Sequence, residues 1–354
     1  MRRQSPQEGE RMRALIYGGG AVGLGIASCL ILSGAKVDII AREGTVSALR
    51  TGGLARTGIF GSVEVGPEGF GAFASLDELL RIGGQRLQDG GLNRDRDFGC
   101  DCDYVLICTK SHGSPAAAAD LSRHRKILGD GGKIVLFQNG WGNAEIFAEH
   151  FPKDQIYSAR VITGFSRPEK NVVEVTVHAD SIHLGSLFSS DLAPMAPLAE
   201  TITKGGIPAE VVPEVGKDLW AKMLYNCALN PLGAIFGVPY GDLAEVSASR
   251  EIMEALIGEI FAVMEAAGYR THWSAPDEYR AVFYERLLPP TARHESSTLQ
   301  DIRAKKSTEI EALSGAVVRL GEEVGVPTPT NATLYRMVKF MEAKNLSAGD
   351  GSGS

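Results

Sequence analysis

Three polar side chains recur at helical spacing in an otherwise apolar stretch of the chain. Lys222, Asn226 and Asn230 stand four residues apart in a predicted helix that ends at Pro231 or Gly233. At about 100° per residue, the three side chains span only about 80° of the helix circumference. One lysine and two asparagines offer hydrogen-bond donors suited to an anionic substrate. The alternative is an ordinary solvent-exposed stripe.

A second pair of polar residues, Ser297 and Glu309, stands in a segment whose apolar residues recur every three to four positions. This period predicts one long helix from about Ser297 to Gly325. The run from Ser297 to Gln300 matches a capping box, so Ser297 taken alone indicates a helix N-cap. Glu309 lies beside the apolar stripe and taken alone indicates a surface carboxylate. Neither residue by itself establishes a site.

A glycine-rich turn that matches G-x-G-x-x-G indicates dinucleotide binding. In this pattern the first glycine makes the tight turn, the second lets the backbone approach a pyrophosphate, and the third lets the helix pack on the strand. The required strand, helix and second strand are predicted at 14–17, 21–33 and 36–40. The alternative is a glycine-rich turn without a ligand. The residues assigned to the cofactor are Gly18, Gly19, Gly20, Ala21, Val22 and Gly23.

The residue after the second strand distinguishes the two nicotinamide cofactors. An acidic side chain there would bind the ribose 2′-hydroxyl of NAD, whereas an arginine would pair with the 2′-phosphate of NADP. Arg42 stands at this place, nineteen residues after Gly23. We therefore expect NADPH/NADP+ as the cofactor, and the neighbouring Glu43 leaves the strictness of that preference open.

Two further apolar runs, 102–108 and 133–137, predict buried strands that each end in polar residues. Ligands of open α/β sheets lie beyond the carboxyl ends of the strands. Lys110 and Asn139 follow these runs, so we expect both beside the nicotinamide half of the cofactor. The alternatives are a strand-end lysine in solvent and an asparagine that only serves its turn.

Together these elements predict an α/β Rossmann-type N-terminal domain with a mainly parallel sheet, followed by an all-α C-terminal domain. Alternating runs between about 155 and 185 indicate further strands, at 171–177 and 181–184, that complete the sheet. Beyond them the alternation gives way to long helical patterns with few strand signals.

The predicted domain boundary lies near Pro213, where strands give way to helices. We expect an NADP-binding domain over 12–213 and a helical catalytic and substrate domain over 214–345. The polar segment 1–11 and the Gly/Ser-rich segment 346–354 are expected to be a flexible extension and a flexible tail.

Two other stretches could be misread. The stretch 81–99 lacks an apolar period and predicts a surface insertion of unknown role. The segment 14–35 carries no charge and is long enough to cross a bilayer, but its six glycines divide it into a strand, a turn and a helix. We therefore expect no membrane span.

The composition excludes several classes. A net charge of −7 leaves no basic field for a nucleic-acid backbone. The five cysteines are an odd number at no disulfide spacing, which indicates a reducing cytoplasm. Cys100 and Cys102 have no second Cys/His pair at zinc-site spacing, so no metal is expected. The oligomeric state stays open. Five apolar residues of the predicted C-terminal helices could form either core or a homodimer face, and they are Phe261, Val263, Met264, Phe283 and Tyr284.

Several motifs together resemble those of a known family. They are the turn at Gly18, Lys110 after a strand, Gln-Asn-Gly at 138–140, Leu219-Trp-Ala-Lys-Met-Leu-Tyr-Asn-Cys-Ala-Leu-Asn-Pro-Leu232, Ser296-Ser-Thr-Leu-Gln-Asp-Ile-Arg303 and Thr308-Glu-Ile310. With them the chain resembles the ketopantoate reductases (2-dehydropantoate 2-reductases) from about Met12 to Lys344, in order. The blocks around Lys222 and Ser297 are much more specific than the glycine turn.

The resemblance implies an oxidoreductase of the pantothenate and coenzyme A pathway, in which NADPH reduces 2-dehydropantoate to (R)-pantoate. It implies that Lys222 hydrogen-bonds the ketone and donates a proton as hydride arrives at C2, and that Glu309 binds the substrate hydroxyl. This role suits a lysine, because hydride addition builds negative charge on oxygen that an ammonium stabilises. The implied substrate contacts are Asn139, Asn226, Asn230 and Ser297, and the implied additional cofactor contacts are Lys110, Asn139 and Glu309.

The sequence departs from the family pattern just after its strand-end lysine. Gly113 stands where the family often carries a larger polar residue, and His112 replaces an aromatic side chain. The identity of the oxo acid therefore stays open, because the family also includes D-2-hydroxyacid dehydrogenases. A noncatalytic NADPH-binding sensor is a third interpretation, although it would not need Lys222 and Glu309 together.

Overall fold

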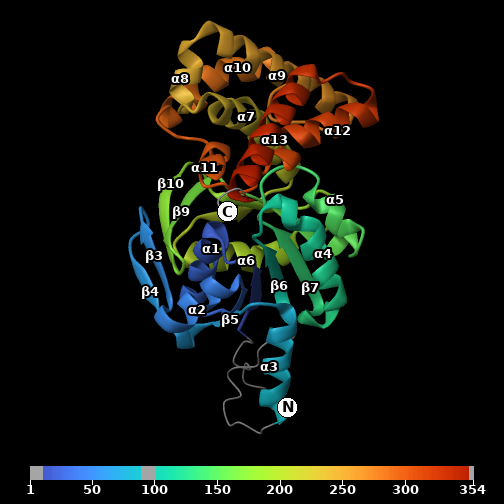
Figure 1. Cartoon of the computed structure of the whole chain (residues 1–354). Coiled ribbons are helices and arrows are strands. Elements are labelled where there is room, and N and C mark those ends of the chain that lie inside the picture. The colour runs from blue at the N-terminus through green and yellow to red at the C-terminus, as the bar shows by residue number, and fades with distance from the viewer. Residues whose placement is uncertain (1–10, 89–100, 351–354) are drawn as a thin grey trace. The chain divides into compact units, whose positions relative to one another are not determined.

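The structure is a computed structural model that describes residues 11–88 and 101–350 (Figure 1). This part of the chain forms two compact units. The first unit holds the residues up to Thr109, 113–138 and 144–215, and the second holds 110–112, 139–143 and the residues from Gly216 onward. Two short segments that follow strands of the first unit are thus part of the second.

An eight-stranded sheet forms the centre of the first unit. Its strands are β1 (Arg13–Tyr17), β2 (Lys36–Ile40), β5 (Gly71–Phe73), β6 (Cys102–Ile107), β7 (Leu128–Leu136), β8 (Ile156–Arg160), β11 (Ile182–Gly185) and β12 (Ala209–Val211). They lie in the order β12-β11-β8-β7-β6-β1-β2-β5, and all neighbours are parallel except β8 and β11. This sheet confirms the expected Rossmann-type α/β fold with mainly parallel strands.

A second sheet was not expected from the sequence. It has four strands, β3 (Leu54–Gly58), β4 (Val63–Val65), β9 (Thr163–Glu169) and β10 (Val172–His178), in the order β4-β3-β10-β9. The expectation that 171–177 completes the main sheet is therefore wrong. Alternation predicted this strand correctly, but its pairing of Val172 with Ala55 joins distant segments, and local alternation does not specify a partner.

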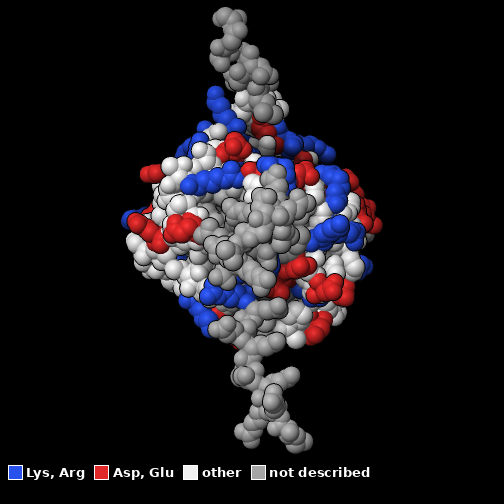
Figure 2. Space-filling view, turned by 90° about the horizontal axis from the view of Figure 1, so that it is seen from below, with Lys and Arg blue, Asp and Glu red and all other residues white. Residues whose placement is uncertain are grey.

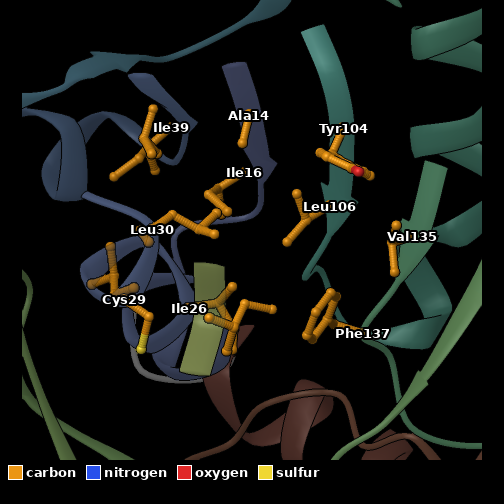
Figure 3. Close-up of a cluster of buried hydrophobic side chains, with 14 of the residues drawn as sticks. Ala14, Ile16, Ile26, Cys29, Leu30, Ile39, Tyr104, Leu106, Val135 and Phe137 are labelled. Carbon is orange, nitrogen blue, oxygen red and sulfur yellow. The ribbon is translucent and has the colours of Figure 1, made fainter. Parts of the chain in front are cut away.

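Helix α1 (Ala21–Leu32) explains the charge-free stretch near the N-terminus. It contacts β1 and β2 of the main sheet and also β3, β9 and β10 of the second sheet. Figure 3 shows its side chains Ile26 and Leu30 in one cluster with Ile16 of β1 and Leu106 of β6. A Cβ on Gly25 would lie 2.4 Å from the Phe165 ring. Its residues from Gly23 to Leu30 are all buried, which explains why this part of the helix is apolar on all sides.

The remaining helices of the first unit are α2 (Glu43–Gly52), α3 (Leu76–Gln88), α4 (Ser114–Arg123), α5 (Asn143–Ala148) and α6 (Ala196–Lys204). Helix α3 corrects part of the expected surface insertion at 81–99. Residues 81–88 continue a helix whose buried start includes Leu76 and Leu79. The rest of the expected insertion lies outside the described residues.

The described part of the second unit contains helices and no strand, which confirms the all-α C-terminal region. Its helices are α7 (Val215–Phe236), α8 (Tyr240–Glu245), α9 (Ser247–Ala266), α10 (Pro276–Val282), α11 (Ser297–Arg303), α12 (Ser314–Val324) and α13 (Pro329–Asp350). Helix α7 does not end at Pro231 or Gly233 as expected. Burial of Leu232 and Ala234 beyond the proline compensates for the hydrogen bond that the proline removes.

The expected single helix from Ser297 to Gly325 is also wrong. Helix α11 ends at Arg303, Lys305 adopts a left-handed φ of 52°, and a short 3-10 turn at 310–312 precedes α12. The apolar period continues across this break, which is why the sequence pattern did not reveal it. Helix α13 extends to Asp350, so 346–350 is helical, while the rest of the expected tail and the segment 1–10 lie outside the described residues.

Surface charge, helix hydropathy and the buried apolar side chains each concern an expectation about partners. On the face drawn in Figure 2, the visible acidic and basic side chains are interspersed. Among residues 11–88 and 101–350, every helix falls short of the length or the hydropathy that a membrane span requires. The sequence leaves open whether five apolar residues form core or a dimer face. Four of them lie in the core of the chain, namely Phe261, Val263, Met264 and Phe283.

Candidate active site

Helix α7 carries the lysine at the centre of the candidate site. Lys222 and Asn226 are both half-buried, one helical turn apart, and the apolar residues around them, including Trp220 and Leu224, are buried. The Lys222 Nζ donates a 2.5 Å hydrogen bond to Oδ1 of Asn139. The i, i+4 spacing therefore belongs to a partly enclosed lysine and is not a fully exposed stripe.

Asn139 connects this lysine to a carboxylate. Its Nδ2 donates to Oε2 of Glu309 at 2.9 Å, and the other carboxylate oxygen, Oε1, accepts the Ser111 backbone N–H at 3.1 Å. Lys222, Asn139, Glu309 and the Ser111 amide thus form one continuous chain of hydrogen bonds. Three segments that are distant in the sequence supply it, and all three belong to the second unit.

Glycine and two tryptophans hold Asn139 in place. Gly140 has a φ of +88°, and a Cβ there would lie 2.4 Å from the carbonyl oxygen of Ala312. The backbone N–H of Trp141 donates to the same oxygen at 2.8 Å. The rings of Trp141 and Trp220 lie 4.7 Å apart at 36°. The segment after Asn139 is therefore bonded to the 310–312 turn that follows Glu309. It also packs on α7 through Trp220, which stands two residues before Lys222.

The break between α11 and α12 determines where Glu309 lies. Because the chain leaves the helix, Glu309 is half-buried at the start of the turn 310–312. Its neighbour Thr308 donates through both its backbone N–H and its Oγ1 to Glu342 of α13, at 2.7 Å each. Burial by itself raises the pKa of Glu342, but the Thr308 hydrogen bonds and the Lys339 ammonium together hold it below its usual value.

Lys110 is held by the same region of the second unit. Its Nζ forms an ion pair with Asp301 of α11 and donates to the carbonyl oxygen of Ser307 at 3.2 Å. Burial raises the pKa of Asp301, although the Lys110 ammonium opposes that rise. The alternative of a strand-end lysine in solvent does not describe this half-buried, paired side chain.

The other predicted substrate contacts occupy different environments. Within the described residues, the Asn226 amide and the exposed Ser297 hydroxyl make no hydrogen bond to protein. Asn230 is buried, its Oδ1 accepts the Tyr240 hydroxyl at 2.6 Å, and it lies about 12 Å along the helix axis from Lys222. The structure does not bring Asn230 into the hydrogen-bond chain described above.

The expectation that Ser297 caps the helix is wrong. The N-cap of α11 is Ser296, whose buried side chain accepts the Leu299 backbone N–H at 3.0 Å and donates to the Asn230 carbonyl oxygen. Ser297 is the first helical residue and its hydroxyl is exposed. The capping pattern was therefore assigned one residue too late, and the correct cap leaves Ser297 available to a ligand.

The glycine turn in the first unit has the geometry that its sequence predicts. Gly18 has a φ of +121°, and a Cβ there would lie 2.7 Å from the Thr109 nitrogen. A Cβ on Gly23 would lie 2.0 Å from the Gly18 carbonyl oxygen. A Cβ on Gly20 would meet the Cys108 carbonyl oxygen at an unstrained 3.9 Å. Gly20 is thus not required by packing within the described residues, and it precedes the first residue of α1, where a helix N-terminus offers free backbone N–H groups.

The expected cofactor-selecting residue stands beside this turn. The backbone N–H groups of Gly18 and Gly19 donate to the carbonyl oxygen of Ile40, the last residue of β2. Arg42 follows as the exposed N-cap residue of α2. The end of β2 and the glycine turn are therefore joined directly, and Arg42 lies two residues from the junction.

Other predictions concern cysteines and metals. The described cysteines Cys29, Cys102, Cys108 and Cys227 are free thiols, and Cys100 lies outside the described residues. Within the described part of the chain no group of three His, Cys, Asp or Glu side chains could hold a metal ion.

Sequence reasoning missed four residues that shape this site, and they are Ser111, Trp141, Asp301 and Glu342. Asp301 and Trp141 stand inside or next to motifs that the sequence analysis singled out, so their position was a usable signal. The backbone N–H of Ser111 and the carboxylate of Glu342 act through contacts that only folding creates. No sequence pattern marks either of them.

Comparison with known proteins decides the family. The family model "Ketopantoate reductase PanE/ApbA" matches residues 14–188, and "Ketopantoate reductase PanE/ApbA C terminal" matches residues 214–342. A protein of Aquifex aeolicus (strain VF5) named 2-dehydropantoate 2-reductase is 36% identical over 336 residues, which are 95% of this chain and 98% of that protein. The chain belongs to the ketopantoate reductase family. It is accordingly an oxidoreductase of the type that acts on a CH–OH donor.

Solved structures share the ketopantoate reductase fold with this chain. The PanE/ApbA family ketopantoate reductase from Ralstonia eutropha JMP134 matches with a TM-score of 0.77 at 26% identity, covering 95% of this chain and 100% of that one. The ternary structure of D-mandelate dehydrogenase with NADH and anilino(oxo)acetate matches with a TM-score of 0.78 at 21% identity, covering 94% and 99%. The second likeness establishes the common fold alone.

Proposed function

We propose that this protein catalyses the NADPH-dependent reduction of 2-dehydropantoate (ketopantoate) to (R)-pantoate. The hydrogen-bond chain from Lys222 through Asn139 to Glu309 is the observation that carries the proposal. It combines one cationic proton donor, one neutral amide and one carboxylate acceptor within a partly buried site. The relative from Aquifex aeolicus that spans nearly the whole chain supports this reaction by its name.

Lys222 acts as the proton donor. When bound, the nicotinamide supplies the hydride that is transferred to C2 of the oxo acid. The Lys222 ammonium hydrogen-bonds the ketone oxygen, stabilises the negative charge that develops on it, and transfers a proton to give the 2-hydroxyl group. The hydrogen bond to the Asn139 oxygen orients the ammonium group before substrate arrives.

Glu309 selects the rest of the substrate. A carboxylate is a hydrogen-bond acceptor only, so it suits the hydroxyl group that 2-dehydropantoate carries besides its ketone. Asn139 and Ser111 each occupy one of its oxygens, which fixes the orientation of the carboxylate plane. Asn226, Asn230 and Ser297 are proposed as further polar contacts to the substrate.

The cofactor proposal rests on the glycine turn and Arg42. The turn residues Gly18 to Gly23 would hold the phosphates, and Arg42 would pair with the 2′-phosphate of NADPH. Lys110, Asn139 and Glu309 are proposed as contacts of the nicotinamide half. The place of Gly20 before the first residue of α1, where a helix N-terminus offers free backbone N–H groups, supports the fit of a phosphate.

We further propose the functional division of the chain into an NADP-binding domain over 12–213 and a catalytic domain over 214–345. The two family models, which match 14–188 and 214–342, support that division. A reducing compartment such as the cytoplasm suits the free thiols of the four described cysteines.

A substrate panel tests the proposed reaction. NADPH oxidation is followed by absorbance with ketopantoate, 2-oxoisovalerate and benzoylformate at equal concentrations, and the highest kcat/KM is expected for ketopantoate. A preference for 2-oxoisovalerate or benzoylformate would instead assign a D-2-hydroxyacid dehydrogenase type of activity, consistent with the unusual His112 and Gly113. Tight NADPH binding without oxidation of any of the three would assign a sensor.

A further inference from the structure

The hairpin that joins β9 and β10 places one cation at the glycine turn of the first unit and a second cation at the start of α2. Arg167 of β9 donates from Nη1 to the Gly19 carbonyl oxygen at 2.7 Å and reaches the Thr45 Oγ1 at 3.5 Å. In the turn that follows, Lys170 Nζ lies 2.8 Å from where a Cβ of Gly44 would stand. The hairpin therefore contacts both the glycine turn and the first turn of α2.

These contacts involve residues that stand before and after Arg42 in the sequence. Gly19 is bonded to Ile40, two residues before Arg42, and Thr45 is bonded through its N–H to the carbonyl oxygen of Arg42 itself. The basic cluster formed by Arg42, Arg167 and Lys170 thus combines side chains that are far apart in the sequence. It lies at the end of β2, next to the proposed phosphate-binding turn.

In the part of the chain that the structure describes, no carboxylate balances the charge of the basic cluster. Among the described residues, no Asp or Glu side chain comes within 4 Å ion-pair distance of Arg42, Arg167 or Lys170. Burial lowers the pKa of the Arg167 guanidinium, and repulsion by the nearby Arg42 lowers it further. Cations that repel one another at a fixed position are stabilised by an anion bound between them.

Arg167 has donors to offer such an anion. Nη1 is occupied by the Gly19 carbonyl oxygen, which holds the guanidinium plane against the turn. A guanidinium has five N–H donors in a rigid fork, so most of them stay available for phosphate oxygens. A side chain so anchored loses little freedom when it binds a ligand.

We propose that Arg167, assisted by Lys170, is a second cofactor-selecting residue, which together with Arg42 binds the 2′-phosphate of NADPH. The proposal rests on the proposed function, since it specifies which residues recognise that cofactor. It assigns cofactor choice to a hairpin of the second sheet as well as to the end of β2.

Small probes separate the 2′-phosphate from the pyrophosphate. The probe 2′,5′-ADP carries the 2′-phosphate without a pyrophosphate, whereas ADP carries the pyrophosphate alone, and both are titrated calorimetrically against the full chain. We expect Arg167→Gln to weaken 2′,5′-ADP about tenfold, since a hydrogen-bonded charge pair is lost, and to change ADP affinity less than twofold. Arg167→Lys is expected to fall between wild type and Arg167→Gln, because it keeps the charge without the fork.

Controls make each outcome decisive. Arg123→Gln removes an exposed arginine of α4 that pairs with Asp120, and it should leave both affinities unchanged. Equal weakening of ADP and 2′,5′-ADP by Arg167→Gln would overturn the proposal and make Arg167 a structural clamp on the turn. Loss of 2′,5′-ADP binding in Arg42→Gln but not in Arg167→Gln would overturn it while leaving the NADPH assignment intact. A wild-type protein that binds ADP more tightly than 2′,5′-ADP would contradict the NADPH assignment itself.

Discussion

The amide oxygen of Asn139 lies 2.5 Å from Nζ of Lys222, and the amide nitrogen of the same residue lies 2.9 Å from Glu309. One asparagine thus presents its acceptor to a cation and its donor to an anion. Direct contact between the lysine and the glutamate would make an ion pair in which each group neutralises the other. The intervening amide orients both groups and leaves each of them to interact with the substrate separately.

This arrangement makes Asn139 a residue whose removal should reduce turnover. We expect Asn139→Ala to lower kcat by about 10–100-fold, which corresponds to one lost hydrogen bond to a charged group. Asn139→Asp keeps the shape but places a second carboxylate beside Glu309, so its kcat should be no higher than that of the alanine variant. Steady-state kinetics with NADPH and ketopantoate measures both. Wild-type kcat in Asn139→Ala would contradict the assigned orientation role.

Lys222 should be essential for chemistry and dispensable for cofactor binding. Lys222→Ala is expected to lower kcat by about 10²–10⁴-fold, the usual contribution of a general acid, while the Kd of NADPH stays unchanged in a fluorescence titration. Lys222→Arg keeps a positive charge but is a poor proton donor, so it should recover little activity. The exposed Lys126 provides the control, since Lys126→Ala should behave as wild type. Unchanged turnover in Lys222→Ala would rule out its role.

We expect Glu342 to make the free energy of unfolding depend on pH. Its pKa is lowered in the folded state, so its stabilising contribution is fully present above the unfolded glutamate pKa of about 4.3 and is lost as pH falls through the lower folded value. We expect Glu342→Gln to reduce the free energy of unfolding by about 2 kcal/mol at neutral pH, since its hydrogen bonds to Thr308 involve a charged acceptor. The difference from wild type should shrink below about pH 4.

Denaturant unfolding at several pH values measures this effect. Glu323→Gln, at an exposed position of α12, is the matched control and should show no such dependence. A Glu342→Gln difference that is constant from neutral to acidic pH would show that the carboxylate charge does not anchor the segment before Glu309.

Gly140 should be intolerant of a side chain for two separable reasons. Gly140→Ala forces a residue with a Cβ into a φ of +88° and also places that Cβ 2.4 Å from the Ala312 carbonyl oxygen. Gly131 of β7 has a similar φ of +83° but no atom within 4 Å of its Cβ position. Gly131→Ala should therefore cost only the conformational term of about 1–2 kcal/mol.

We expect Gly140→Ala to cost more than Gly131→Ala in thermal unfolding, and to lower kcat as well because Asn139 moves with it. Equal destabilisation by the two substitutions, with unchanged kcat, would show that the close approach to Ala312 is relieved without displacing Asn139.

Elements with local signals could be predicted from the amino-acid sequence. The glycine turn, the strands on each side of it and the change to helices near Pro213 all follow from spacing and residue type within short windows, and the structure agrees with them. Lys222 and Asn226 could be singled out for the same reason, since helical spacing relates residues that are close along the chain.

The contacts of these residues could not be predicted, because they arise from tertiary packing. The second sheet, the continuation of α7 past Pro231, the break before Glu309 and the Ser296 cap depend on packing between distant segments, which outweighs local propensity. The hydrogen bonds from Asn139 to Lys222 and Glu309, and from Arg167 to Gly19, likewise join residues more than 80 positions apart. No periodicity encodes such pairs, because their geometry exists only once the backbone has folded.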